Sequence, residues 1–437
     1  MGLPLPPMPI PPSDPLLHQT PRQTGDLSTI LVVHPDLFGG PVHVPYLASL
    51  ARNLPQFRFV VATSAPRISD GEWPPNVSFL WRRVTRLDEA ERKLPVGLGR
   101  VLGMFTDFTK AVQYRRIARG QRFDAMHVHV GLEVENLMRV GRRFHLKGLW
   151  NVARWLSDFH WTNRPVLFTD HSLFTRRSDL GFPNPLHEAD MSVTLAQDNV
   201  ICVEREGQAY LSSHDSRMGV VRRSWYVPNG IDTERFAFKP LESRKALRIG
   251  YVGRIFRAGE SRTFLPLLAS RLPEDVELHL AVSSTQTETE VRDLWFAGSR
   301  VSIERNVPNR EMPRFYWSVD LVVNPMIWAA LGRTTLEAMS CGRPVLMFGN
   351  TDRHPVTEAT GYLAAVDDVE SVLKLLNRLR DARDELALRG RNARDAIVRE
   401  FDERRVAGVT GSIYSNLIKD QTRSGGLTPR LVHGQGA

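Results

Sequence analysis

The chain of 437 residues is long enough for two or three domains with well-buried cores. Its 42% hydrophobic and 24% charged residues are ordinary for a soluble globular protein, and two cysteines are too few for a disulfide framework. No apolar run reaches the roughly 18 residues of a membrane span, and the proline-rich start lacks the apolar region of a signal peptide. A cytoplasmic protein is therefore expected.

The net charge of +9 is concentrated in residues 81–154, which hold sixteen Lys or Arg and seven Asp or Glu. One basic cluster is Arg115, Arg116, Arg119 and Arg122, and a second is Arg139, Arg142, Arg143 and Lys147, with Phe144, Trp150 and Trp155 nearby. A basic segment with aromatic residues suits an anionic membrane, so the second cluster is a candidate for peripheral membrane or acceptor contact. The alternative is a solvated basic helix face. No nucleic-acid-binding motif is present, so no nucleic-acid partner is expected.

In chain order, residues 1–26 are proline-rich and are predicted to be a disordered tail. Residues 27–240 then alternate apolar runs with helical stretches, as in a doubly wound α/β domain. A helix is predicted at 44–54. Strands are predicted at 30–33, 57–62, 77–81, 124–130, 165–169, 200–203 and 224–227.

A second α/β unit is predicted over residues 241–400, after a polar, proline-containing boundary at 236–246. Its strands are predicted at 247–254, 276–281, 301–305, 321–323 and 345–348. A long helix is predicted at 395–418, and residues 421–437 are predicted to be a second disordered tail.

The stretch 321–348 reads as strand, helix and strand, and its apolar strands suit a parallel sheet. Between them, the helix begins with small and hydroxyl residues, including Gly332, Thr334 and Thr335. The first turn of such a helix presents backbone N–H groups that attract an anion such as phosphate. The alternative is an ordinary βαβ unit with a capped helix.

The run LEAMSCGRPV at 336–345 resembles the C-terminal signature of GT-B glycosyltransferases of the retaining family 4 type, also called glycosyltransferase group 1. In that family a glutamate at the position of Glu337 binds the ribose hydroxyls of a nucleotide-sugar, and Gly332 matches a glycine of the same motif. A carboxylate suits a vicinal diol because it can accept two O–H donors. The family's first glutamate is replaced by Ala329.

Four other segments match the same family in the same order over residues 30–418. They are Gly39-Gly40, the H-V-H run at 127–129, TDHSLF at 169–174 and PNGID at 228–232. The resemblance implies that Gly39 and Gly40 approach the donor diphosphate and that His171 lies near the donor sugar. The TDHSLF segment is similar to that of the GPI GlcNAc-transferase and phosphatidylinositol mannosyltransferase branch.

The resemblance implies a GT-B fold, with two doubly wound Rossmann-like domains facing across a cleft. It also implies a C-terminal helix, at 401–420, that packs back on the first domain. The activity implied is retaining transfer of a sugar from a nucleotide-sugar to the hydroxyl of a sugar, lipid-linked or small-molecule acceptor. Arg254 would neutralise the leaving diphosphate, although Gly259 stands where the family has a lysine. No cofactor and no metal are expected, because no Asp-x-Asp and no cluster of metal ligands occurs.

Two other functions stay open. A non-catalytic binding or scaffold protein of the same fold would explain Ala329 and Gly259 together. A nucleotide-sugar epimerase would share the fold but not the TDHSLF segment.

Overall fold

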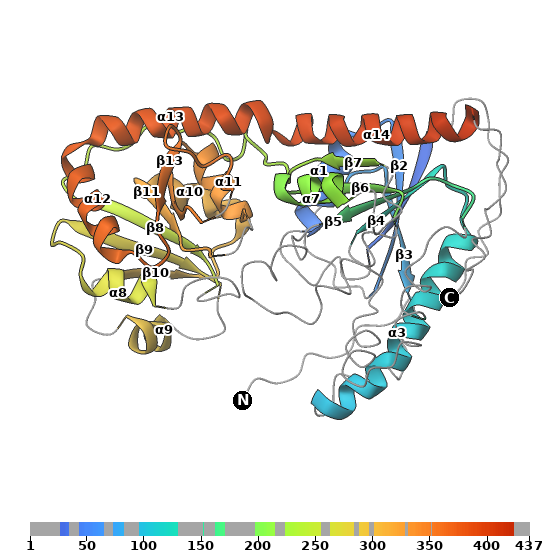
Figure 1. Cartoon of the computed structure of the whole chain (residues 1–437), viewed down its shortest axis with the longest axis horizontal. Helices are drawn as coiled ribbons and strands as arrows, with labels where there is room; N and C mark the ends of the chain where they lie inside the picture. Colours follow the sequence, from blue (N-terminus) through green and yellow to red (C-terminus); the bar gives the residue numbers. More distant parts are fainter. Residues whose placement is uncertain are drawn as a thin grey trace.

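The computed structural model describes residues 27–34, 43–64, 73–82, 96–129, 152, 162–170, 197–214, 223–254, 263–283, 288–296, 301–327, 331–350 and 352–423. These residues form two parallel β-sheets with helices packed on their faces (Figure 1). Among the helices described, none is long and apolar enough to cross a membrane.

The first sheet has seven parallel strands in the order β3-β2-β1-β4-β5-β6-β7. The strands are β1 (Ser28–Val33), β2 (Phe57–Ser64), β3 (Val77–Arg82), β4 (Ala125–His129), β5 (Val166–Asp170), β6 (Asn199–Cys202) and β7 (Arg223–Tyr226). The helices are α1 (His43–Asn53), α3 (Val96–Arg119) and α7 (Arg205–His214). Parallel strands need crossover connections, and these helices lie in the connections from β1 to β2, from β3 to β4 and from β6 to β7.

The second sheet has six parallel strands in the order β10-β9-β8-β11-β12-β13. The strands are β8 (Leu247–Gly253), β9 (Val276–Val282), β10 (Val301–Arg305), β11 (Leu321–Asn324), β12 (Val345–Phe348) and β13 (Gly361–Ala364). The helices are α8 (Phe264–Ser270), α9 (Glu288–Trp295), η2 (Asn309–Glu311), α10 (Met312–Ser318), α11 (Arg333–Ser340), α12 (Val369–Asp381) and α13 (Arg383–Glu400).

Each sheet is covered on both faces, because its strands are apolar on both sides. In the first sheet, Leu31 and Val33 pack with α3 and α7, while Ile30 and Val32 pack with α1 and α14 (Glu403–Arg423). In the second sheet, one face packs with α8, α9 and α12 and the other with α10, α11 and α13. The last helix, α14, therefore belongs to the core of the first sheet although it follows the second.

The prediction of one continuous helix at 395–418 is wrong. Helix α13 ends at Glu400 and α14 begins at Glu403. Between them the chain makes a bridge from Asp402 to Ile231, the segment that joins the two sheets. The Ile231 N–H donates to the Phe401 carbonyl at 2.8 Å, and the Glu403 N–H donates to the Ile231 carbonyl at 3.0 Å. The two segments that connect the sheets are thus hydrogen-bonded to each other. Helices α13 and α14 lie almost end to end in Figure 1.

The carboxylate of Asp402 fixes this break. It accepts hydrogen bonds from the Thr233 hydroxyl at 2.5 Å and from the Arg404 N–H and guanidinium. Burial alone raises the pKa of the Asp402 carboxyl, but the bonds from Arg404 and Thr233 lower it more, so the pKa lies below its ordinary value. The carboxylate is therefore charged at neutral pH.

Two glycines in the C-terminal helices give opposite predictions. A Cβ on Gly390 would lie 2.2 Å from the Gly342 carbonyl oxygen, whereas a Cβ on Gly408 would meet nothing within 4 Å. Gly390→Ala should therefore destabilise the fold by about 2 kcal/mol or more, by forcing α13 away from α11. Gly408→Ala should stabilise it by roughly 0.5–1 kcal/mol through helix propensity.

Chemical denaturation of both variants measures the two effects. Equal stability of Gly390→Ala and the wild type would contradict the close packing of α13 on the turn after α11.

Candidate functional site

The second sheet has a switch point between β8 and β11. From β8 the chain continues outward to β9 and β10, and it then returns to β11 on the other side of β8. In open α/β sheets, ligands bind beyond the carboxyl ends of the strands at such a point. Arg254 follows β8 there, and Asn324 ends β11. The predicted arginine therefore lies where the topology favours a ligand.

The main chain at Arg254 is anchored while its side chain is exposed. The Tyr251 hydroxyl donates to the Arg254 carbonyl oxygen at 2.6 Å, and the Ser283 N–H donates to the Gly253 carbonyl at 3.0 Å. These bonds position the end of β8, so the guanidinium projects from a defined point. A permanently charged fork of this kind can hold two oxygens of a phosphate.

Helix α11 begins beside the same strand ends. Gly332 is its N-cap, with an extended backbone. Thr335 is buried; its hydroxyl accepts a hydrogen bond from the Asn324 amide at 2.8 Å, and its N–H donates to the Gly332 carbonyl. Thr335 thus ties the helix start to the end of β11, while Thr334 is half-buried. The positive end of the helix dipole is thus held at the edge of the sheet that carries Arg254, an arrangement that favours an anion.

Glu337 is only 3% exposed and already has two partners. Its carboxylate accepts a hydrogen bond from the Tyr316 hydroxyl at 3.0 Å and forms an ion pair with Arg333, whose Nε donates at 3.0 Å. Burial and the neighbouring Glu337 raise the pKa of the Tyr316 hydroxyl well above its ordinary value, which keeps it a donor. A carboxylate has about four acceptor positions, so capacity for two further donors remains.

Other residues of the signature are structural. Arg343 is fully buried, and its guanidinium donates to carbonyls of Tyr316 and Lys239 at 3.0 and 2.7 Å. Burial lowers the pKa of this guanidinium to about 10. Gly342 has φ +77°, and a Cβ there would lie 2.5 Å from the Phe238 ring. These two residues fasten the segment entering the second domain to the turn after α11.

The first sheet has its own switch point, between β1 and β4. His34 follows β1 and His129 ends β4, and their rings stack with centroids 5.4 Å apart. Both side chains are buried, and Tyr46 of α1 packs its ring edge against His129. The sequence pattern singled out the H-V-H run, but it did not single out His34 or Tyr46. The position of His34 directly after a buried strand was the available signal.

His127 connects this edge to the last helix. One ring nitrogen shares a hydrogen bond with the Tyr414 hydroxyl at 2.5 Å, and the other shares one with the Thr169 hydroxyl at 2.6 Å. All three side chains are buried. Thr169 lies next to Asp170, the last residue of β5, so α14 helps to fix the strand end that precedes His171. Tyr414 lies 287 residues from His127 in the sequence, which explains why no local pattern predicted it.

Several predicted site residues lie outside the described residues. They are Gly39, Gly40, His171, Arg139, Arg142, Arg143 and Lys147, together with the substituted positions Ala329 and Gly259. The structure brings Arg254, Gly332, Thr334 and Thr335 to one edge of the second sheet. Glu337 lies one turn further along α11.

Residues 246–381 match the glycosyl transferases group 1 family. The chain is 27% identical over 221 residues to the lipopolysaccharide core biosynthesis mannosyltransferase LpsB of Rhizobium meliloti, and the match covers 44% of this chain and 62% of that protein. It is 26% identical over 200 residues to the MMP α-(1→4)-mannosyltransferase of Mycolicibacterium hassiacum, covering 44% of this chain and 48% of the relative. The chain thus spans less than two thirds of the length of either relative.

Solved structures with the same fold cover most of the chain. Sucrose-phosphate synthase from Thermosynechococcus elongatus superimposes with a TM-score of 0.68 at 17% identity, covering 90% of this chain and 100% of that structure. Anabaena HepE in complex with UDP and glucose gives a TM-score of 0.60 at 14% identity, covering 89% and 100%.

The solved structures show that the chain has the predicted GT-B fold, and residues 246–381 match a glycosyl transferases group 1 domain, as the resemblance in the sequence implied. The narrower branch indicated by the TDHSLF segment stays a prediction.

The buried carboxylate gives the first prediction for the site. Glu337→Gln keeps the side-chain volume but removes the charge, so a bound diol would lose a charge-assisted acceptor. Donor affinity should fall by roughly 1.5–3 kcal/mol, measured by calorimetry. Tyr316→Phe is the matched control, because it removes a bond to the same carboxylate and keeps the charge. Unchanged affinity in Glu337→Gln would remove Glu337 from the donor site.

The link between α14 and β4 gives the second prediction. Tyr414→Phe leaves a buried ring nitrogen of His127 without its hydroxyl partner, so the fold should lose about 1–3 kcal/mol of stability. Ser412→Ala is the control, since its exposed hydroxyl bonds only the Gly408 carbonyl of its own helix. Denaturation midpoints that coincide for Tyr414→Phe and Ser412→Ala would mean that the Tyr414–His127 bond does not stabilise the domain.

Proposed function

We propose that the protein is a retaining glycosyltransferase, which moves a sugar from a nucleotide-sugar to an acceptor hydroxyl without a metal ion. The observation that carries the proposal is that Arg254 and the start of α11 both lie at the carboxyl edge of the second sheet, at its switch point. A positive side chain and oriented N–H groups are there available to a departing diphosphate. The family match over 246–381 covers this same region.

In the proposed reaction, the bond between the anomeric carbon and the diphosphate oxygen breaks as the acceptor oxygen bonds to the same carbon. The acceptor proton passes to the departing phosphate oxygen, so attack and departure share one face of the sugar. Arg254, the N–H groups at the start of α11 and the Gly39-Gly40 loop meet the negative charge that develops on the diphosphate. No carboxylate nucleophile is needed.

Two further roles complete the proposal. Glu337 accepts the ribose hydroxyls, using the acceptor positions that Tyr316 and Arg333 leave open. His171 orients the donor sugar. We also propose a cytoplasmic protein with peripheral contact to an anionic membrane, to which Arg139, Arg142, Arg143 and Lys147 would contribute.

The contacts that Glu337 already makes with Tyr316 and Arg333 favour a second candidate function, that of a non-catalytic binding protein of the same fold. The ion pair with Arg333 balances the charge of Glu337 without a ligand, and Ala329 and Gly259 depart from the family pattern. Incubation with UDP-, GDP-, ADP- and dTDP-sugars separates the two candidates. A transferase releases nucleoside diphosphate, whereas a binding protein shows donor-induced thermal stabilisation alone. Because both relatives are named mannosyltransferases, mannose donors belong in the panel beside glucose donors.

The role of Arg254 gives a quantitative prediction. Arg254→Ala should lower turnover by about 100-fold or more, as expected when one contact to transition-state charge is lost. The matched control is Arg391→Ala, which removes an exposed arginine from the outer surface of α13. His171→Ala should lower turnover with less effect on nucleoside diphosphate binding. Full activity in both Arg254→Ala and His171→Ala would place the reaction elsewhere.

A further inference from the structure

Helix α11 begins with an arginine that does not favour the helix itself. Arg333 is the first residue of the helix, directly after the N-cap Gly332. A cation at this end faces the positive pole of the helix dipole, and an arginine four residues before a glutamate is the weaker order for an ion pair on a helix. Residues that break local rules in a well-packed structure are expected at functional sites. Arg333 is therefore a candidate for a role that the sequence pattern did not assign.

The contacts of Arg333 leave part of its guanidinium unused. Its Nε donates to the Glu337 carboxylate at 3.0 Å, and its Nη1 donates to the Gly230 carbonyl at 3.4 Å, which is long for a hydrogen bond. In the part of the chain that the structure describes, its Nη2 makes no hydrogen bond. The Arg333 side chain is 13% exposed. A guanidinium has several N–H donors, so Arg333 can hold Glu337 and still donate to a ligand.

A second arginine, Arg235, lies near the same carboxylate. Burial lowers the pKa of Arg235, the charge of Glu337 opposes this shift, and the charge of Arg333 adds to it. The carboxylates of Asp232 and Glu403 also oppose the shift. The negative charge of Glu337 therefore acts on two guanidinium groups, and Arg333 remains able to attract a further anion.

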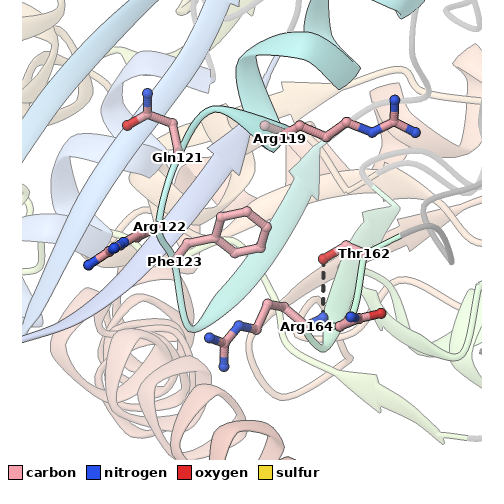
Figure 2. A pocket seen from close by; sticks show the side chains of 8 residues that line it. Arg119, Gln121, Arg122, Phe123, Thr162 and Arg164 are labelled. Carbon is pink, nitrogen blue, oxygen red and sulfur yellow. Dashed lines mark hydrogen bonds between the residues drawn. The ribbon is translucent and has the colours of Figure 1, made fainter. Parts of the chain in front are cut away.

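Arginines also gather at another place, away from the candidate donor site. Arg119, Arg122 and Arg164 line a hollow of about 520 Å³, which Figure 2 shows. These residues lie just before β4 or β5 in the chain, so the hollow is at the amino edge of the first sheet. The candidate donor site lies beyond the carboxyl edge of the second sheet. Arg333, at the start of α11, lies at that edge.

We propose that Arg333 binds the donor diphosphate as a second cation beside Arg254, while its Nε stays on Glu337. This role deepens the proposed function and rests on it. Side chains of an α-helix lean toward its N-terminus, so a first-turn arginine can reach an anion bound there. Each phosphate of the diphosphate carries negative charge, and Arg254 supplies a single positive one. Glu337 thus has two tasks, because it orients Arg333 and accepts the ribose hydroxyls.

Charge repulsion makes the diphosphate the part of the donor that depends on Arg333. A nucleotide bound at this edge brings its diphosphate close to the buried Glu337 carboxylate, and two anions in a partly buried site repel each other. The Arg333 guanidinium between them pairs with both. Without it, Glu337 would repel the diphosphate but not the uncharged nucleoside. Arg333 therefore sets the preference for diphosphate over nucleoside.

Calorimetry with a nucleoside diphosphate and its own nucleoside tests this role. The diphosphate is the one of UDP, GDP, ADP and dTDP that most raises the thermal midpoint of the wild type. Arg333→Gln removes the positive charge and keeps an N–H donor for Glu337. Its affinity for the diphosphate should fall about tenfold or more, while its affinity for the nucleoside stays within about threefold of the wild type. Arg333→Lys restores a charge without the planar fork and should bind the diphosphate with intermediate affinity.

Arg389→Gln is the matched control. Arg389 forms an ion pair with Glu385 at the same four-residue spacing, and it bonds the Gly361 carbonyl at the opposite, amino edge of the second sheet. Both affinities should stay at the wild-type value in this variant. Thermal midpoints without nucleotide show whether each variant folds. If Arg333→Gln is unstable, Arg333→Lys decides the question, since an unchanged diphosphate affinity in that variant would overturn the role of Arg333.

The outcomes separate this role from the transferase itself. An equal ratio of diphosphate to nucleoside affinity in Arg333→Gln and the wild type would overturn the role of Arg333 and leave the donor site at Arg254 standing. If the wild type binds the diphosphate with the expected dependence on Arg333 but releases none from any nucleotide-sugar, the transferase is refuted and the role of Arg333 stands. Failure of the wild type to bind any of these diphosphates would refute both.

Discussion

The backbone pairing of Ile231 with Phe401 and Glu403 is the contact on which the rest of the structure depends. This contact joins the two places where the chain passes between the sheets. A movement of one domain relative to the other would therefore disturb both crossings. Gly230 makes room for this contact, since a Cβ there would lie 2.8 Å from the Glu403 Cα. The Arg333 guanidinium also donates to the Gly230 carbonyl, at 3.4 Å. The start of α11 is thereby attached to the crossing itself.

A few residues therefore both carry the charges of the candidate site and connect the two domains. The Arg333 guanidinium donates both to the Gly230 carbonyl at the crossing and to the Glu337 carboxylate. Arg333 would therefore connect a diol bound to Glu337 with the junction of the domains. Tyr414 plays the corresponding part in the first domain, because it sits on the helix that follows the crossing and bonds a histidine of β4. The carboxyl edges of both sheets are therefore held by groups that also hold the domains together.

Much of this could be predicted from the sequence, and the remainder depends on contacts between distant residues. The buried strands were predictable because apolar runs such as those of β11 and β12 are bounded by turn residues. The break at Phe401 and Asp402 was not, since apolar Phe401 suits a continuing helix and the interruption depends on contacts with the distant residues Ile231 and Thr233. Strand β13 is short and half-exposed, so its pattern is weak. The engagement of Glu337 by Tyr316 was likewise hidden, because a motif shows a residue's type and not its partners.

A crystal structure with the nucleoside diphosphate that most raises the thermal midpoint tests the central claim most directly. The account predicts the diphosphate beyond the carboxyl ends of β8 and β11, with its oxygens within hydrogen-bond distance of the Arg254 guanidinium and the first N–H groups of α11. The ribose hydroxyls should reach the Glu337 carboxylate. A nucleotide bound away from this edge, or bound there without contact to Arg254, would contradict the account.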